Sequence, residues 1–279
     1  MAIFYNQATL IHNGQITNSN TTSAEISSSQ ALTKTAIINE YSENGSIAYL
    51  VTIENNRQTP ITDATLSDNL GAYAYGTGAL YPLEFNDGSL LYFVNGTLTD
   101  GAVATVNDGA LQISGINLPA YSTAQLIYTV TANGFAPLEA GSQITNTVSL
   151  GELTASESIS VKEESELSIT KFVCTDNVSA SGEIVYTFII QNTGNTAAVA
   201  TDDVIVVDTF DPVLNIDEVT LNGEALSENL GYTYNAQTGE FATLNGQITV
   251  AAATFTRAPD TGAVITTPGV SVITVRGTV

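Results

Sequence analysis

The sequence contains an internal repeat whose second copy ends early, and no other feature limits the possible folds as strongly. The second copy begins with LSITKFV, GEIVYTFIIQN and DDVIVVDTFDP, which match ALTKTAI, GSIAYLVTIEN and DATLSDNLG in the first. The spacing is also kept, since Lys34 precedes Tyr49 by 15 residues. Lys171 likewise precedes Tyr186 by 15 residues. A repeat of roughly 110–135 residues is too long for a solenoid unit and suits an immunoglobulin-like β-sandwich.

The residue pattern within each copy predicts an all-β chain. Apolar and polar residues alternate in short runs. No stretch of a dozen residues carries a helical apolar stripe. Turn-forming pairs separate the runs, namely Asn13-Gly14, Asp87-Gly88, Asn95-Gly96 and Asn222-Gly223. We therefore predict two sandwich domains, at residues 31–161 and 167–279, joined by an acidic linker at residues 162–166.

The second domain lacks the last strands of the first domain. Its final segment SVITVRGTV corresponds to AQLIYTVTANG, after which only the first domain continues into ITNTVSL and ASESISV. The missing type of strand occurs instead at the start of the chain. Its alternating residues are Phe4, Asn6, Ala8 and Leu10, which match Ile144, Asn146, Val148 and Leu150. The repeat unit is therefore permuted across the ends of the chain.

Residues 1–26 are predicted to form a donor hairpin arm, with strands at 4–11 and 15–26 around the Asn13-Gly14 turn. A sandwich without its last strands exposes core residues and an unpaired sheet edge. The linker at 27–30 spans at most about 14 Å, whereas a sandwich of such strands is roughly 35–40 Å long. Donation of the arm to another copy of the chain is therefore easier than donation to its own second domain. Such a head-to-tail contact need not close, so it builds a filament.

Each repeat places a lysine and an acid on inward strand faces, and an asparagine lies on each of the two matching strands. The first set is Lys34, Asp68 and Asn146, and the second set is Lys171, Asp208 and Asn6. A buried, unpaired lysine is costly, so the pattern requires an explanation. One explanation is a buried ion pair capped by the asparagine amide.

The other explanation is a spontaneous Lys–Asn isopeptide bond. Burial favours a neutral, nucleophilic amine, which attacks the amide carbon and releases ammonia. A protonated aspartic acid donates to the amide oxygen and shuttles protons. This hypothesis assigns catalysis to Asp68 and Asp208, an internal bond to Lys34 and Asn146, and an intermolecular bond to Lys171 and Asn6. Asp63 and Asp203 remain alternative acids.

Several of these segments resemble a known bacterial family. ALTKTA, IAYLVTIEN, LSDNLG and ITNTVSL, together with LSITKF, IVYTFIIQNTGN and VVDTFDP, are similar to the surface repeat catalogued as domain of unknown function 11. The resemblance covers nearly the whole chain and implies immunoglobulin-like sandwiches on bacterial cell or spore surfaces. Lys–Asn bonds in related Gram-positive pilin and adhesin domains support the triad by analogy. The first residues, MAIFYNQ, lack the features of a secretory signal. In this respect the chain resembles fibre proteins that are made inside a sporulating mother cell and released with the spore.

Composition excludes several other classes of function. The net charge of −22, with six basic and 28 acidic residues, argues against nucleic acid and anionic membranes as partners. No apolar run is long enough to span a bilayer. His12 is the single histidine, so a histidine-rich metal site or a hydrolase triad is not expected. Asp202-Asp203 and Asn86-Asp87 suit solvated turns better than calcium sites. We predict no cofactor and no metal.

Two further features favour packing over function. Cys174 is the only cysteine, so it cannot form an internal disulfide and is expected to be a small buried side chain. Core packing is also favoured over a ligand platform for a cluster of aromatic residues. Its members are Tyr73, Tyr75, Tyr81, Phe85, Tyr92 and Phe93.

These observations predict a structural subunit, not an enzyme. We expect the chain to polymerise with itself into an extracellular fibre locked by isopeptide bonds. The alternative is a monomeric surface adhesin or binding module.

Overall fold

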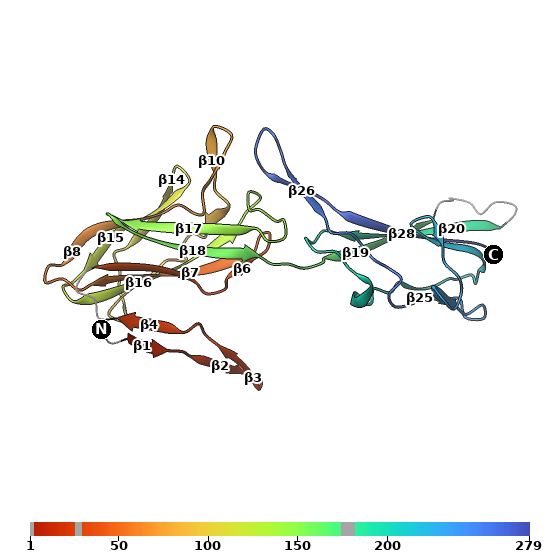
Figure 1. Ribbon diagram of the computed structural model, residues 1–279, viewed down its shortest axis with the longest axis horizontal. Helices are drawn as coiled ribbons and strands as arrows, with labels where there is room; N and C mark the ends of the chain where they lie inside the picture. The colour runs from red at the N-terminus through yellow and green to blue at the C-terminus, as the bar shows by residue number, and fades with distance from the viewer. Residues whose placement is uncertain (1–2, 26–29, 174–181) are drawn as a thin grey trace. The chain divides into compact units, whose positions relative to one another are not determined.

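The computed structural model describes residues 3–25, 30–173 and 182–279 (Figure 1). Its regular structure consists of β-strands and one short 3-10 helix, η1 (Ala200–Asp202), which confirms the predicted all-β class. The chain divides into two compact units. One unit comprises Met1–Lys162 and Pro259–Val264, and the other comprises Glu163–Ala258 and Ile265–Val279. No helix among the described residues has the length and hydrophobicity of a membrane span.

The N-terminal arm is a hairpin, as the sequence predicts. Its strands are β1 (Ile3–Asn6), β2 (Thr9–His12), β3 (Gln15–Asn18) and β4 (Thr22–Glu25), with β1 paired to β4 and β2 to β3. Asn13 and Gly14 form the turn, and both have positive φ angles, of 50° and 78°, as a tight hairpin turn requires. Residues 5–23 are all exposed. Residues 27–29 of the predicted linker lie outside the described residues.

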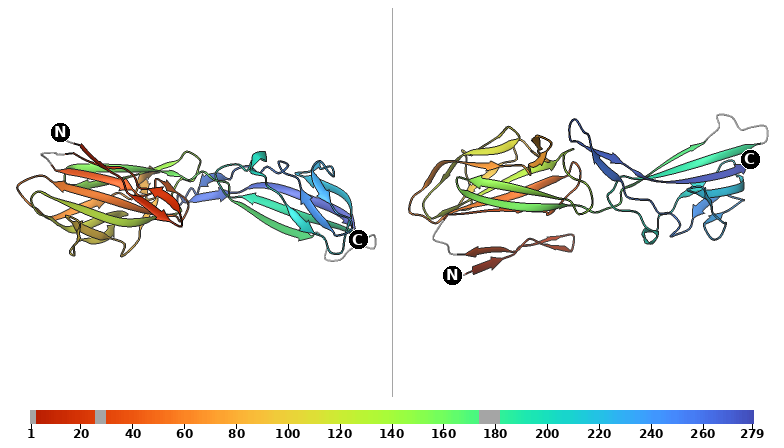
Figure 2. Two further views of the ribbon diagram at one scale, coloured as in Figure 1. Left: turned by 90° about the horizontal axis from the view of Figure 1, so that it is seen from below. Right: turned by 45° about the horizontal axis from the view of Figure 1, so that its top comes forward.

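The first unit contains two six-stranded sheets arranged as layers (Figure 2), and their strands pair antiparallel except for the parallel pair β18 and β6. One sheet consists of β5 (Ala31–Ala36), β7 (Ser46–Asn55), β16 (Ser122–Ala132), β12 (Leu91–Val94), β13 (Thr97–Leu98) and β11 (Leu83–Phe85). The other consists of β14 (Val103–Asn107), β15 (Ala110–Leu118), β8 (Ile61–Asp68), β17 (Gln143–Leu150), β18 (Leu153–Val161) and β6 (Glu40–Tyr41). A small hairpin joins β9 (Tyr73–Tyr75) to β10 (Gly78–Leu80).

This strand order is that of an immunoglobulin-like sandwich. The neighbours β5, β7 and β16 correspond to strands A, B and E, and β8, β17 and β18 correspond to C, F and G. Inward residues of both sheets form the core, because alternate residues of each strand are buried. Its largest fully buried side chains include Tyr49, Tyr128, Ile53, Leu66, Leu111 and Ile113.

The second unit repeats the first sheet and only part of the second. Its five-stranded sheet consists of β19 (Leu167–Val173), β20 (Glu183–Asn192), β28 (Gly269–Thr278), β22 (Asn215–Leu221) and β23 (Glu224–Ala225). Its three-stranded sheet consists of β21 (Val207–Thr209), β25 (Glu240–Thr243) and β24 (Tyr232–Tyr234). A separate hairpin is formed by β26 (Thr254–Arg257) and β27 (Val264–Thr267). Phe188, Phe210, Phe241, Ile248 and Val275 are among its buried core residues.

The two units differ in what covers strand C. In the first unit, β8 pairs with β15 on one side and with β17 on the other. Its counterpart β21 pairs with β25 only, among the residues that the structure describes. In the first unit β18 also contacts β5, whereas every residue of the corresponding β19 is exposed. Within the part of the chain that the structure describes, the second sandwich therefore has no strand at the positions of F and G, in agreement with the repeat.

The segment predicted as a linker forms no strand but is tied down by hydrogen bonds. Lys162 N donates to Tyr41 O at 2.7 Å within the first unit. Glu164 N and Glu166 N donate to the side chains of Asn195 and Asn192, each at 3.0 Å, within the second unit.

Candidate functional site

The first candidate site lies in the core of the first unit and begins with Lys34. The alternation of β5 turns this side chain inward, where its Nζ donates to Oδ2 of Asp68 at 2.6 Å. Asp68 is the last residue of β8, and both side chains have 0% exposure. Burial of an ion pair costs desolvation, so such a pair is maintained only by close contact and further hydrogen bonds.

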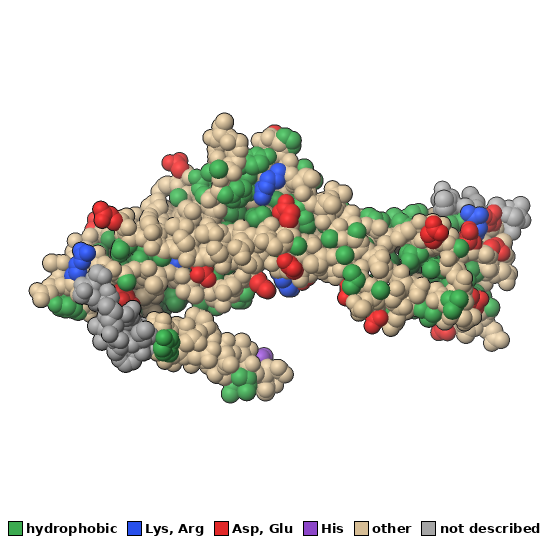
Figure 3. Space-filling view, viewed as in Figure 1, with side chains coloured by type: hydrophobic (Ala, Val, Ile, Leu, Met, Phe, Trp, Pro, Cys, Tyr) green, Lys and Arg blue, Asp and Glu red, His purple; other side chains and the backbone are tan. Residues whose placement is uncertain are grey.

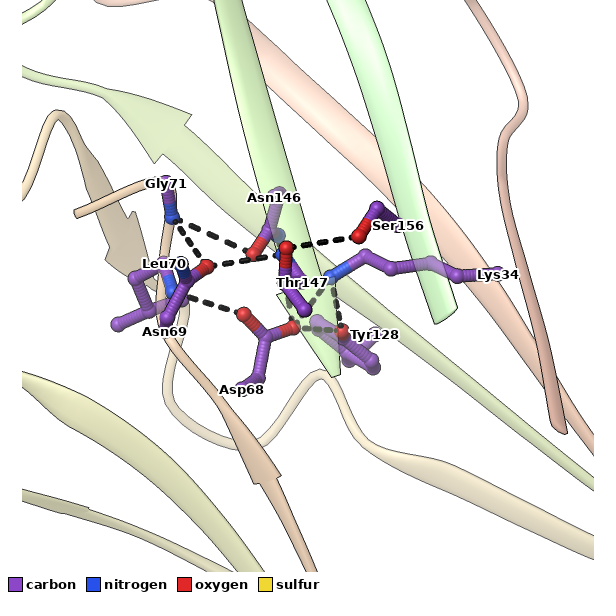
Figure 4. A network of polar contacts seen from close by, with 9 residues as sticks. All are labelled: Lys34, Asp68, Asn69, Leu70, Gly71, Tyr128, Asn146, Thr147 and Ser156. Carbon is purple, nitrogen blue, oxygen red and sulfur yellow. Dashed lines mark hydrogen bonds and ion pairs between the residues drawn. The ribbon is translucent and has the colours of Figure 1, made fainter. Parts of the chain in front are cut away.

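Asn146 joins this pair from β17. The antiparallel register places Val148 opposite Asp68, and the Asn146 side chain is fully buried. Its Nδ2 donates to Asp68 Oδ2 at 3.4 Å, the oxygen that also accepts from Lys34 (Figure 4). The structure therefore brings together the three residues of the predicted internal site.

The amide oxygen of Asn146 differs from the expectation. The sequence hypothesis has the aspartic acid donate to this oxygen, but Oδ1 accepts instead from the backbone N–H of Gly71, at 3.3 Å. Gly71 has a φ of 71°, and a side chain there would collide with Ile144 of β17. Glycine thus permits the close approach of the turn to the asparagine. Asp68 faces the amide nitrogen, which is the group that would leave.

Two tyrosines complete the site, and sequence reasoning missed both. Tyr128 donates its hydroxyl proton to Asp68 Oδ2, and Lys34 Nζ donates to Tyr128 Oη at 3.2 Å. Lys34 Nζ also lies 4.3 Å from the ring centroid of Tyr49, a cation–π distance. Tyr49 and Tyr128 are directly opposite on β7 and β16. The sequence does place both tyrosines on the inward faces of their strands. Any tyrosine packed in a core has the same pattern, so the pattern alone does not identify a site residue.

The two tyrosine hydroxyls have different roles. The Tyr49 hydroxyl faces the Asn146 side chain, yet among the described residues it is the one buried side-chain polar atom without a completed hydrogen bond. The Tyr128 hydroxyl, in contrast, holds Asp68 in place. Burial raises the pKa of both tyrosines, so both hydroxyls remain protonated.

Burial also determines the charge state of the lysine. It lowers the pKa of Lys34 to about 8, although the charge and hydrogen bond of Asp68 act in the opposite direction. A neutral amine is therefore accessible near neutral pH, and only a neutral amine is a nucleophile. The site can support either a stable ion pair or attack of the amine on the adjacent amide.

The second candidate site has the same lysine and acid in an open setting. Lys171 forms an ion pair with Asp208, but their side chains are 37% and 18% exposed. Lys171 Nζ lies 4.5 Å from the ring centroid of Tyr186, 5.2 Å from that of Phe210 and 5.5 Å from that of Phe188. These three rings form an aromatic surround of the Lys171 amine.

The second site lacks an equivalent of Tyr128. Tyr186 is paired with Val275, whereas Tyr49 is paired with Tyr128. Asp208 therefore has no tyrosine hydroxyl from the position where Asp68 has one.

The predicted donor residues lie on the exposed arm. Asn6, Ala8 and Leu10 are exposed, while Phe4 belongs to β1 and is paired with Ala24. Their counterparts on β17 are buried, namely Ile144, Asn146, Val148 and Leu150.

The other described residues that the sequence singles out lie outside both lysine sites. Asp63 and Asp203 are exposed, and neither replaces Asp68 or Asp208 as the lysine partner. His12 is exposed. In the aromatic cluster, Phe85 and Tyr92 are buried, and the others are partly exposed. Cys174 lies outside the described residues.

The described residues contain no group of three or more histidine, cysteine, aspartate or glutamate side chains that could hold a metal ion. Acidic side chains are scattered over the visible face of the molecule (Figure 3).

Comparison with known proteins finds only distant similarity. No family model matches the chain, and no curated protein matches it. Among solved structures, the chain is similar to the major pilin subunit BcpA of Bacillus cereus, with 10% identity and a TM-score of 0.36, over 95% of this chain and 73% of that one. The pilus backbone protein RrgB of Streptococcus pneumoniae matches with 10% identity and a TM-score of 0.34, over 86% and 55%. The major pilin SpaD of Corynebacterium diphtheriae matches with 9% identity and a TM-score of 0.34, over 85% and 58%. At these identities and TM-scores the likeness carries no argument about function.

Proposed function

We propose that the protein is a structural subunit that self-assembles head to tail by donor-strand complementation into a fibre on a bacterial cell or spore surface. The observation that carries this proposal is the uncovered side of β21 and β19 in the second unit. The matching strands β8 and β5 of the first unit are covered by β17 and β18. The arm supplies a hairpin of the same type, and its residues 5–23 are exposed.

The register of the first unit specifies how the arm would dock. Val148 lies opposite Asp68 on β17 and β8. Ala8 has the position of Val148 in the repeat, so it would lie opposite Asp208. Asn6 would then take the position of Asn146, facing Lys171 of the acceptor chain. Docking would bury Leu10 and the apolar residues of β19, and this burial drives association.

The chemistry proposed for the internal site is an exchange of one amide for another. Lys34 Nζ attacks Cγ of Asn146 and forms a tetrahedral intermediate, while Asp68 accepts a proton from Nζ. The bond from Cγ to Nδ2 then breaks, Asp68 returns the proton to Nδ2, and ammonia leaves. The N–H of Gly71 is placed to stabilise charge on Oδ1. The reaction occurs once per site, so the protein acts on itself and not as an enzyme on external substrates.

The joint between subunits would form in two stages. The exposed Lys171 site first receives the arm reversibly, and the aromatic surround then loses water. Exclusion of water favours the neutral amine, so attack on Asn6 follows docking. Asp208 has the role of Asp68 in this second bond. A fibre assembled in this way would resist dissociation even when its subunits unfold.

Electron microscopy of purified protein, with and without residues 1–26, tests the proposal. The complete chain is expected to form fibres, and the truncated chain is expected to stay monomeric because the donor is missing. A synthetic peptide of residues 1–26 should bind the complete chain and stop growth. Fibres of unchanged repeat from the truncated chain would exclude strand donation. Discrete particles from the complete chain that bind glycans or proteins would favour an adhesin.

A further inference from the structure

We propose that the joint contains a second contact, on the outer face of the sheet, made by Ile205 and Val207 of one chain with Ile11 and Ile16 of the next. This inference rests on the proposed donor-strand function and adds a specificity determinant to it. Its occupant is a second copy of this chain.

All four side chains are large, apolar and exposed. Val207 is 72% exposed and Ile205 is 45% exposed. On the arm, Ile11 is 68% exposed and Ile16 is 67% exposed. Hydrophobic side chains are visible near the tip of the arm (Figure 3). Exposed apolar side chains mark an interaction surface where they adjoin one another on one face.

Ile205, which lies just before β21, and Val207, its first residue, point to the outward face. Their neighbour Val206 is buried in the core of the second unit, and side chains alternate between faces along an extended chain. On the arm, Leu10 belongs to the inward stripe, so Ile11 points to the opposite face. Ile11 and Ile16 are directly paired on β2 and β3, so they share that face.

The register of the first unit then brings the two pairs together. On β17 and β8, Ser149 lies opposite Ser67 and Leu150 lies opposite Leu66. The same alignment places Thr9 opposite Val207. Two residues further along, the antiparallel alignment places Ile11 opposite Ile205.

The first unit has polar residues at the positions of Ile205 and Val207. The positions of Ile205 and Val207 are held there by Thr65 and Ser67, and Ser149 of β17 pairs with the latter. β17 ends at Leu150, whereas β2 continues to His12 and so carries an additional outward residue, Ile11. At these two positions the outer face is therefore polar in the first unit and apolar in the second, where the covering strand would come from another chain. An intermolecular contact must offset the entropy lost on association, which a covalently continuous domain does not lose.

The experiment uses full-length protein carrying Asn6→Ala, so that docking stays reversible. The lowest concentration at which fibres form is measured by sedimentation. Ile205→Thr and Val207→Ser, which introduce the residues of the first unit, should each raise it about 3–10-fold, because a half-buried aliphatic contact is lost. Ile11→Thr should have the same effect. Leu230→Thr, at another exposed position of the second unit, should leave it unchanged.

A double-mutant cycle tests the contact itself. Ile205→Thr combined with Ile11→Thr should raise the threshold by clearly less than the product of the two single effects, because both remove one contact. Circular dichroism checks that each variant is folded. If the parent assembles and the variants match it, or if the effects multiply, the outer contact is wrong and strand donation stands. If the Asn6→Ala parent does not assemble at any concentration, the outer contact and reversible docking both fail.

Discussion

Lys34 Nζ and Asn146 Nδ2 both donate hydrogen bonds to the same oxygen of Asp68, at 2.6 Å and 3.4 Å. The acid therefore contacts both nitrogens between which a proton must move if the lysine replaces the amide nitrogen. This arrangement sits in a fully buried core. It is the geometric basis for the predictions about the first unit.

The first prediction concerns the internal bond. The intact mass of the monomer should be lower than the sequence mass by one ammonia. Lys34→Ala and Asp68→Ala should each restore the unmodified mass, once the substitution itself is counted. Lys162→Ala removes an exposed lysine outside both sites and serves as the control, which should keep the deficit. An unmodified mass in the wild type would show that Lys34 and Asp68 form only an ion pair and that no bond to Asn146 exists.

The second prediction concerns pH and requires a chain in which the bond cannot form, such as Asn146→Ala. The pKa of Lys34 is lowered from 10.5 to about 8 in the folded state, so the unfolded state binds more protons between these values. The free energy of unfolding should therefore rise as the pH rises from about 8 to about 10.5, by up to roughly 3 kcal/mol. Below about pH 8 both states bind the proton, so this contribution should level off at its lowest value.

Chemical denaturation followed by circular dichroism measures this dependence. The matched control is Asn146→Ala with Lys34→Met, in which the titrating group is absent. The difference in slope between the two variants isolates the lysine. Equal slopes would show that burial does not lower the pKa of the Lys34 amine.

The third prediction separates the two tyrosines. In the Asn146→Ala background, Tyr128→Phe should lower the free energy of unfolding by about 1–3 kcal/mol, because Asp68 loses a buried hydrogen bond. Tyr49→Phe should be neutral or slightly stabilising, because its hydroxyl completes no hydrogen bond. The same denaturation experiment measures both. Equal losses in the two variants would contradict the assigned roles.

The sequence was sufficient to predict the fold class and the grouping of Lys34, Asp68 and Asn146, for a simple reason. Period-two alternation places Lys34 and Asp68 among core residues, and the repeat identifies their counterparts without any structural information. The missing strands were also predictable, because Asn6 repeats the setting of Asn146.

Other features depend on contacts between distant strands, which alternation does not specify. Tyr128 reads as an ordinary core residue until β16 is aligned with β7 and its hydroxyl meets Asp68. The role of Gly71 depends on the turn after β8 approaching β17. The outward position of Val207 gains significance only when the register of β17 on β8 is known.

Denaturing electrophoresis of fibres tests whether the proposed joint between subunits is covalent. After boiling in detergent without reductant, wild-type fibres should give a ladder of covalent oligomers. Tandem mass spectrometry should find the peptide containing Lys171 joined to the N-terminal peptide containing Asn6. Lys171→Ala, Asp208→Ala and Asn6→Ala should still assemble but collapse to monomer on boiling, and Lys162→Ala should keep the ladder. The ladder should be present in the wild type and lost in Lys171→Ala; a wild-type sample without a ladder, or a ladder that survives Lys171→Ala, would exclude a bond between Lys171 and Asn6.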